Sequence, residues 1–160
     1  MTSDRDRLSL LERMADGFNA HDLNEIMSLF TDDCVFVAPR GPDAWGRVFE
    51  GQAGVREGLG ARFTTIPDVH YGDGSHFVSG DRGVSEWTLS GTTTDGVRIE
   101  VRGCDLWTFR DDKVVVKNSF WKIVERYRIA VMSAVPTVYG VLAERPVDAD
   151  IASLRMPIVG

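Results

Sequence analysis

Residues 97–110 read Val97-Arg98-Ile99-Glu100-Val101-Arg102-Gly103-Cys104-Asp105-Leu106-Trp107-Thr108-Phe109-Arg110. Side chains of a β-strand alternate between the two faces of its sheet, so every second residue of this stretch shares a face. The face that carries Trp107 is apolar except for Asp105, whereas the opposite face is mostly charged or polar. Burial of a carboxylate disfavours its charged form, so Asp105 needs either a specific partner or a role in proton chemistry.

The segments around this stretch predict an α+β fold. Upstream, apolar residues at helical spacing predict one helix with a stripe of Leu8, Leu11, Ala15 and Phe18, a second that begins near Asp22, and a third with Val55, Leu59 and Phe63. A short strand over residues 34–38 and a loop over 39–51 separate the last two helices, and further strands cover 68–78, 83–94 and 113–125. Long twisted antiparallel strands are expected to curl around the N-terminal helices into a cone with an open mouth and a pocket on its inner face.

The turn after residues 97–110 determines which residue lies opposite Asp105. A two-residue loop pairs Asp105 with Asn118, whereas a three-residue loop from Arg110 to Asp112 pairs Asp105 with Lys117. Two-residue hairpin loops favour glycine, and this one would consist of two aspartates. We therefore favour the three-residue loop, in which only Asp112 adopts the left-handed conformation.

This register places Lys117, Ser119 and Trp121 on the inner face with Asp105 and Trp107. Asp105 and Lys117 then form either a half-buried ion pair that only sets the strand register, or an acid/base group with a cation that tunes it or holds an anionic ligand. The indoles of Trp107 and Trp121 are expected to sandwich a flat ligand.

Alternation leaves other candidates undecided. Either Trp87 or its neighbour Glu86 faces the pocket, and Trp87 is taken as a candidate ligand contact. His70 and His76 lie near strand ends and are either surface residues or bases at the pocket mouth. We expect no metal and no cofactor, since the sequence has no histidine or cysteine pair at a metal-binding spacing and no phosphate-binding glycine loop. Cys34 and Cys104 are expected to be reduced thiols.

The composition indicates some classes of protein and excludes others. The chain has 160 residues, of which 43% are hydrophobic and 26% charged, as is usual for one soluble domain. Its net charge of −6 argues against nucleic-acid binding. No apolar run is long enough to span a membrane, and the polar N-terminus is unlike a secretory signal, so we expect a cytoplasmic protein.

Three segments resemble the nuclear-transport-factor-two-like superfamily. Residues 18–34, from Phe18-Asn19-Ala20-His21-Asp22 to Leu29-Phe30-Thr31-Asp32-Asp33-Cys34, resemble its opening helices. Residues 51–56, Gly51-Gln52-Ala53-Gly54-Val55-Arg56, resemble the start of its third helix, and residues 101–114 resemble its final hairpin. This resemblance implies an α+β barrel of the cystatin-like type over residues 1–125.

Within this superfamily the chain is similar to ketosteroid isomerases and to SnoaL-type polyketide cyclases. Asp105 falls where isomerases carry a protonated oxyanion-hole aspartate and where cyclases carry a single acid/base aspartate. Met14 falls where isomerases carry the oxyanion-hole tyrosine, and Ala38 falls where they carry the base, so the resemblance favours the cyclases. It also implies that Lys117 occupies a position that is usually apolar in isomerases.

Two functions remain open. The first is a SnoaL-like enzyme in which Asp105 moves a proton on a small, partly aromatic or polycyclic carbonyl compound. The second is a non-catalytic binding domain or dimeric scaffold with the same pocket. We expect a homodimer, because the outer face of the last hairpin would carry apolar Leu106, Val114, Val116 and Phe120. Residues 126–160 are expected to form a C-terminal extension that packs on the domain or on a neighbouring subunit.

Overall fold

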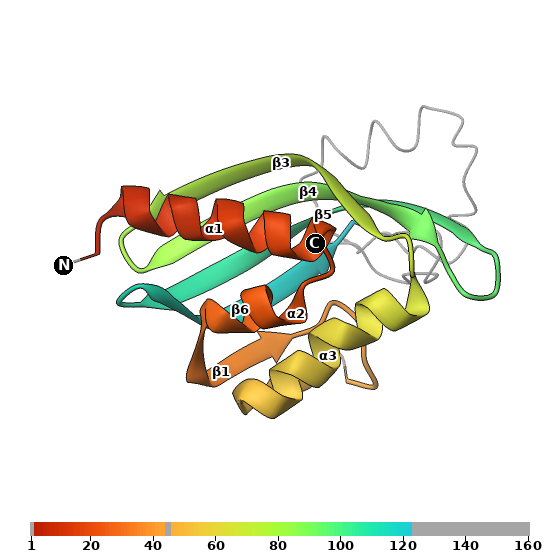
Figure 1. Ribbon diagram of the computed structural model, residues 1–160, viewed down its shortest axis with the longest axis horizontal. Coiled ribbons are helices and arrows are strands. Elements are labelled where there is room, and N and C mark those ends of the chain that lie inside the picture. Colours follow the sequence, from red (N-terminus) through yellow and green to blue (C-terminus); the bar gives the residue numbers. More distant parts are fainter. Residues whose placement is uncertain (1, 44–45, 123–160) are drawn as a thin grey trace, which may run out of the picture. The chain divides into compact units, whose positions relative to one another are not determined.

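The computed structural model describes residues 2–43 and 46–122 (Figure 1). Within them, three helices pack against one six-stranded sheet. The end of the strand expected over residues 113–125, and the extension expected over 126–160, lie outside the described residues.

The first two helices begin at the polar residues that can cap them. α1 (Asp4–Asn19) starts after Ser3, whose hydroxyl accepts the Asp6 N–H at 3.2 Å, while the Asp6 carboxylate accepts the Ser3 N–H at 2.9 Å. This reciprocal pair satisfies two N–H groups that a helix start otherwise leaves free. α2 (Leu23–Ser28) starts after Asp22, whose carboxylate accepts two backbone N–H groups, as expected from the sequence.

The segment expected to be a loop contains a short strand. β2 (Val48–Glu50) pairs antiparallel with β1 (Phe30–Val37), which itself begins four residues earlier than expected. α3 (Gly51–Thr65) follows directly and buries Val55 and Leu59 against the sheet, so the third helix is confirmed.

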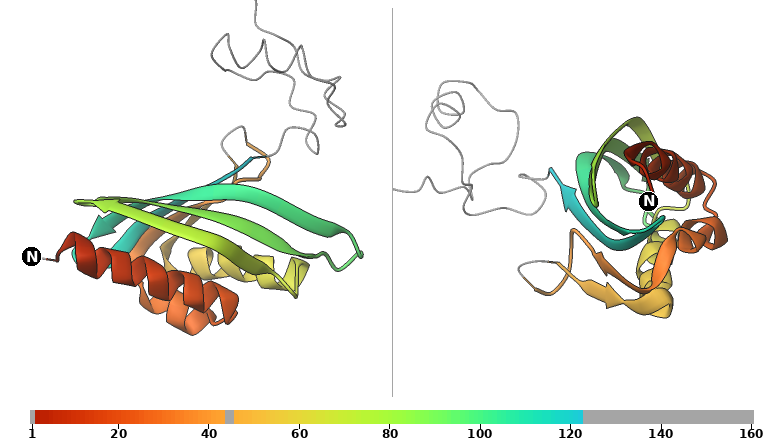
Figure 2. Two further views of the ribbon diagram at one scale, coloured as in Figure 1. Left: turned by 90° about the horizontal axis from the view of Figure 1, so that it is seen from above. Right: turned by 90° about the vertical axis from the view of Figure 1, so that its left-hand side faces the viewer.

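The sheet has the strand order β2-β1-β6-β5-β4-β3. Its long strands are β3 (His70–Ser79), β4 (Arg82–Thr92), β5 (Arg98–Arg110) and β6 (Lys113–Trp121). All neighbours are antiparallel except β1 and β6, which are parallel. Figure 2 shows the sheet curving around the helices, and β2 and β3 are the edge strands of the described sheet. The α+β class with a curved, mostly antiparallel sheet is therefore confirmed, and the sheet is not closed into a barrel.

The turn between β5 and β6 differs from the expectation. Arg110 pairs with Lys113, so the loop has two residues, and Asp111 rather than Asp112 has a positive φ, of 54°. The three-residue loop was wrong because a single aspartate can adopt the left-handed conformation that a two-residue loop needs at its first position.

A β-bulge then changes which side chains of β6 point inward. Phe109 pairs with Val114 but Thr108 pairs with Val116, so Val115 is an extra residue on β6. An extra residue shifts the alternation by one. Beyond the bulge, Lys117 consequently points inward as expected.

The bulge also changes which residues pair directly. Asp105 lies opposite Ser119, not Lys117, and Lys117 lies opposite Trp107. On the near side of the bulge, Val114 points inward and is fully buried in the core, so its expected place on the outer face was wrong.

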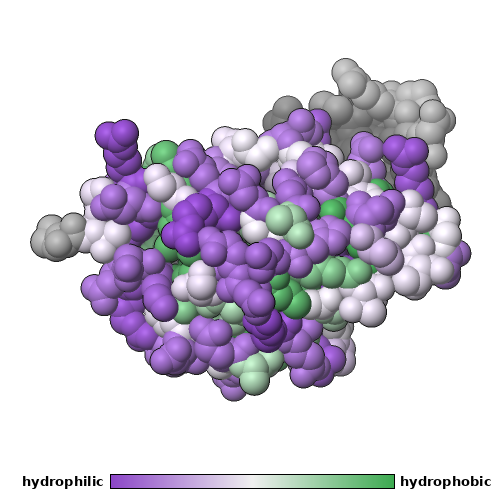
Figure 3. All heavy atoms as spheres, in the orientation of Figure 1, coloured by the Kyte–Doolittle hydropathy of each residue, from purple (hydrophilic) through white to green (hydrophobic). Residues whose placement is uncertain are grey.

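The core lies between the helices and the inner face of the sheet. Its largest fully buried side chains include Trp107, Phe30, Leu11, Met14 and Ile26. The side on which the helices lie is mostly hydrophilic, with small separate apolar patches (Figure 3). The described domain therefore buries its apolar side chains inside the curve of the sheet.

Gly103 on β5 has no room for a side chain. A β-carbon there would overlap the indole of Trp87 and the carbonyl oxygen of Phe120. We expect Gly103→Ala to lower the free energy of unfolding by about 1–3 kcal/mol, since inserted atoms force such neighbours apart. Thermal unfolding measures this loss. The control is Gly54→Ala in α3, where a β-carbon meets only ordinary contacts near 3.8 Å and should be neutral or stabilising. Equal unfolding temperatures for the two variants would contradict this packing of Trp87.

Candidate functional site

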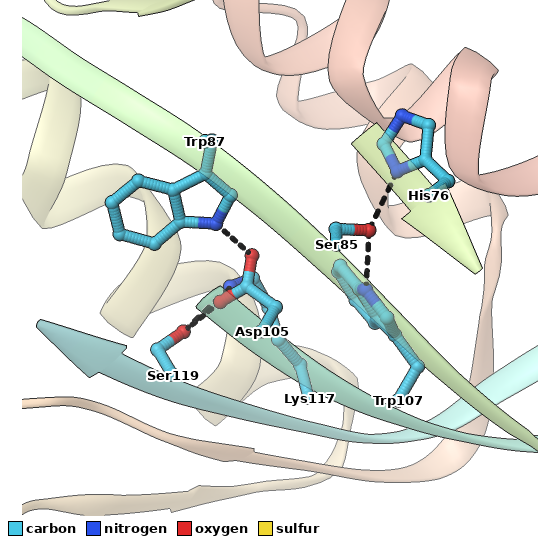
Figure 4. A network of polar contacts seen from close by, with 7 residues as sticks. All are labelled: His76, Ser85, Trp87, Asp105, Trp107, Lys117 and Ser119. Carbon is cyan, nitrogen blue, oxygen red and sulfur yellow. Dashed lines mark hydrogen bonds and ion pairs between the residues drawn. The ribbon is translucent and has the colours of Figure 1, made fainter. Parts of the chain in front are cut away.

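Asp105 lies at the centre of a buried polar network (Figure 4). Its side chain points inward from β5, and the residue is only 4% exposed. Trp87 Nε1 donates to Oδ2 at 2.9 Å, while Lys117 Nζ and the Ser119 hydroxyl both donate to Oδ1 at 2.5 Å. Each of these contacts comes from a donor, so the Asp105 carboxyl acts in this network as an acceptor, as an ionised carboxylate does.

Lys117 is the only buried cation among the described residues, at 5% exposure. Burial lowers the pKa of Lys117, and the charge and hydrogen bond of Asp105 oppose that shift. Nζ also donates to the Ser119 hydroxyl at 2.6 Å. It lies 5.0–5.6 Å from the centroids of three aromatic rings, those of Phe18, Phe36 and Trp107. Ring faces attract a desolvated cation, so the ammonium is held by one carboxylate and an aromatic cage.

A second network connects His76 to the core. Trp107 Nε1 donates to the Ser85 hydroxyl at 2.8 Å, and His76 Nδ1 lies 2.7 Å from the same oxygen (Figure 4). An indole N–H can only donate, so Ser85 either donates its own proton to His76 Nδ1 or accepts a second hydrogen bond from an Nδ1–H group. Burial lowers the pKa of His76, although Glu12 and Asp105 oppose that shift. His76 is therefore neutral at neutral pH and gains charge only in more acidic solution.

A first pocket lies between α1 and the inner face of the sheet. It has about 440 Å³ of space not filled by protein atoms, including space that is open to solvent. Its walls include Met14 and Phe18 from α1, Tyr71 and His76 from β3, and Asp105 and Trp107 from β5. An aromatic lining with a few polar groups suits a small organic ligand.

The second pocket lies towards α3 and the end of β6. It has about 310 Å³ of unfilled space, and its walls include Arg62, Tyr71, Trp87, Lys117, Ser119 and Trp121. Phe18, Tyr71, Trp87 and Lys117 line both pockets, so the two spaces adjoin.

The structure brings most of the expected site residues together. Lys117, Ser119 and Trp87 contact Asp105 directly. Trp87 is buried, whereas Glu86 is exposed, although both line the first pocket. Met14, Trp87 and Trp107 line the first pocket, as do Asp105 and Lys117. Trp121 lines only the second pocket, where the guanidinium groups of Arg62 and Arg40 lie 4.4 Å and 5.1 Å from its ring centroid. The indoles of Trp107 and Trp121 therefore do not face each other across one space, as a sandwich would need.

Sequence reasoning missed Tyr71 and left His76 undecided. Both line the first pocket, yet they are five residues apart, an odd number that strict alternation assigns to opposite faces. The pairing of β3 with β4 is irregular between Gly72 and Ser75, and Asp73 there has a positive φ of 53°. The glycines in this segment were the signal for an irregular strand.

Family comparison agrees with the architecture. The SnoaL-like domain family matches residues 11–117, so the chain belongs to this family. No curated protein matches the sequence.

Solved structures share the fold at low sequence identity. A proposed polyketide cyclase from Xanthomonas campestris pv. campestris is 14% identical, with a TM-score of 0.67 over 76% of this chain and 93% of that one. TerC, co-crystallised with polyporic acid, is 23% identical, with a TM-score of 0.66 over 78% and 97% of the chains. A protein with a ketosteroid isomerase-like fold from Catenulispora acidiphila, in complex with trimethylamine, is 16% identical, with a TM-score of 0.63 over 71% and 85%.

Two further features bear on the kind of site. Among residues 2–43 and 46–122, no group of three or more His, Cys, Asp or Glu residues is arranged to hold a metal ion. In the same part of the chain, none of the helices has the length and apolar character needed to cross a bilayer.

The buried ion pair makes a stability prediction. Lys117→Met leaves the Asp105 carboxylate buried without its cation, so we expect the free energy of unfolding to fall by about 3–5 kcal/mol. The double variant Asp105→Leu/Lys117→Met should recover most of that loss, since apolar residues often replace a buried pair without cost. Chemical denaturation measures both. The control is Arg110→Ala, which breaks an exposed ion pair with Asp33 and should have little effect. A single variant as stable as the original protein would contradict the burial of the pair.

Proposed function

We propose that this protein is a SnoaL-like enzyme that transfers protons on a small, partly aromatic or polycyclic carbonyl compound, with Asp105 as the acid/base. The observation that carries this proposal is a buried carboxylate, held as an acceptor beside a buried ammonium, in the wall of an aromatic pocket. Buried ionisable pairs of this kind are frequent in active sites and are costly as purely structural elements.

The hydrogen bonds favour Oδ2 of Asp105 as the reacting atom. Oδ1 accepts from both Lys117 and Ser119, whereas Oδ2 accepts only from Trp87 and retains a free lone pair. In the proposed reaction Oδ2 takes a proton from the carbon next to a carbonyl, and the substrate becomes an enolate. The resulting Asp105 acid then returns the proton, either to another carbon in an isomerisation or to the new alkoxide after the enolate attacks a second carbonyl.

Lys117 is proposed to stabilise the oxyanion. Its ammonium has three N–H groups, of which two are used by Asp105 and Ser119. The third is available to the enolate oxygen in a site from which water is largely excluded, where such a donor has its greatest effect.

Met14 falls where ketosteroid isomerases carry their oxyanion-hole tyrosine, so the proposed chemistry differs from steroid isomerisation. Met14 lines the first pocket from α1, where it supplies a thioether and no hydrogen-bond donor. The likeness to a proposed polyketide cyclase and to TerC, crystallised with polyporic acid, supports an organic ligand in this fold. At identities of 14% and 23%, neither fixes the substrate.

A second candidate is a non-catalytic binding domain with the same pockets. It is favoured by the three donors around Asp105, since a carboxylate bound in this way can simply hold β5 and β6 in register.

Asp105→Asn separates the two candidates, because Asn keeps the shape of the side chain but cannot take a proton. Hydrogen–deuterium exchange at the α-carbons of 2-tetralone and 2-indanone, followed by NMR in D₂O, measures proton abstraction. The enzyme should accelerate exchange, and Asp105→Asn should reduce that acceleration by about 100-fold or more. Glu100→Gln, on the outer face of the same strand, is the matched control and should exchange normally. If the original protein binds these ketones without accelerating exchange, the binding domain is the better account. If Asp105→Asn accelerates exchange as the original protein does, Asp105 is not the acid/base.

We also propose a cytoplasmic homodimer that pairs through the outer face of the sheet. Leu106 and Val116 lie on that face, and Phe120 is 47% exposed there. Light scattering at micromolar concentration should give twice the mass of the chain, and Phe120→Asp should halve it, because a buried charge opposes association. Val97→Asp, at a position 45% exposed before β5, is the control and should leave the dimer intact. A monomeric original protein would contradict the proposal.

A further inference from the structure

The two adjoining pockets differ in charge. The lining of the first includes Asp105 and Glu86 together with Lys117. The lining of the second includes two cations, Arg62 and Lys117, and no aspartate or glutamate. The whole chain has a net charge of −6, so a cationic pocket is a local departure from its acidic composition.

Arg62 brings donors to the second pocket without protein acceptors. Its guanidinium carbon stands over the Trp121 ring, 4.4 Å from the ring centroid. The residue is half-buried, and the structure gives its side chain no hydrogen bond or ion pair with another described residue. A guanidinium in contact with an indole can still donate its N–H groups to a planar acceptor.

Tyr71 adds a third donor at the boundary of the two pockets. Its ring packs against Phe18 and Trp87, with centroids 5.4 Å apart in each case. Burial raises the pKa of Tyr71 to about 12, so the phenol stays protonated at physiological pH. Among the described residues its hydroxyl has no acceptor.

The side-chain acceptors beside the second pocket already accept hydrogen bonds from other residues of the protein. The Ser119 hydroxyl accepts from Lys117 and donates to Asp105, and Oδ1 of Asp105 accepts from both of these residues. The second pocket therefore has more donors than acceptors. Since Asp105 balances the charge of Lys117, one positive charge remains, that of Arg62.

We propose that the second pocket binds the anionic oxygen of a monoanionic aromatic ligand, a carboxylate or phenolate, through Arg62 and Tyr71. The apolar body of the same ligand occupies the first pocket, beside Asp105. This inference deepens the proposed function, on which it rests for the chemistry at Asp105, by giving the class of substrate: an aromatic carbonyl compound with an acidic group. Arginine suits the role because its fork can donate two parallel hydrogen bonds to a carboxylate.

Two probes of equal shape test the charge preference. 2-Naphthoate carries the anion, and 2-naphthamide is its neutral counterpart. Quenching of tryptophan fluorescence, with calorimetry at neutral pH, measures the dissociation constant of each. We expect the original protein to bind naphthoate about tenfold or more tightly than naphthamide, since hydrogen bonds between charged groups are the stronger ones.

Variants locate the preference at Arg62. Arg62→Gln should bring the two dissociation constants to within about threefold of each other, and Arg62→Lys should retain part of the preference because it keeps the charge without the fork. Arg102→Gln removes an exposed arginine from the outer face of β5 and should leave the preference unchanged. Equal binding of both probes by the original protein, no binding of either, or an unchanged preference in Arg62→Gln would overturn the inference.

The outcome is distinguishable from that of the proposed function because these measurements need no turnover. A preference for naphthoate with no acceleration of exchange in the ketones would overturn the proposed function alone. Accelerated exchange that depends on Asp105, without a preference for naphthoate, would overturn the ligand class alone.

Discussion

The buried ion pair between Asp105 and Lys117 constrains the rest of this structure. Two charged groups that are 4% and 5% exposed are tolerated only if they are paired and hydrogen-bonded. Besides their contact with each other, Trp87 and Ser119 donate to the carboxylate, and Ser119 accepts from the ammonium, which three aromatic rings also surround. The inner face of the sheet is thus organised around a single pair of charges, and the pockets lie on either side of it.

Sequence reasoning predicts the fold and much of the site, but partly through two errors that cancel. The alternation in residues 97–110 predicts that Asp105 faces inward, because β5 is regular there. Lys117 was expected on the same face from a loop that proved one residue too long, and the bulge at Val115 supplies the shift that the shorter loop removes. Val114, on the other side of the bulge, was therefore assigned to the wrong face. A bulge depends on how two strands pair, and a single-strand pattern does not contain that information.

The same limit applies at the edge strand β3. Tyr71 and His76 both reach the first pocket across an irregular stretch, so alternation could not select them. Arg62 was missed for another reason: the third helix has several glycines and a weak apolar stripe, and its inward side is defined only by Val55 and Leu59. The sequence alone did not show which residues of a helix or an edge strand contact the β5–β6 hairpin, which carries the charged residues.

The position of β6 in the sheet has a consequence for how this pocket can change. β6 is hydrogen-bonded on both sides, to β5 and to the parallel strand β1, so the backbone that carries Lys117 and Ser119 is fixed by two ladders. β3, in contrast, lies at an edge of the described sheet: one side pairs with β4, and on the other side Tyr71 is held by two hydrogen bonds to Asn19 of α1. The part of β3 that bears His76 is therefore held by one ladder, whereas the wall that bears the charges is held by two. Homologues that accept ligands of other shapes should differ mainly along this part of β3, while the charged wall determines the chemistry.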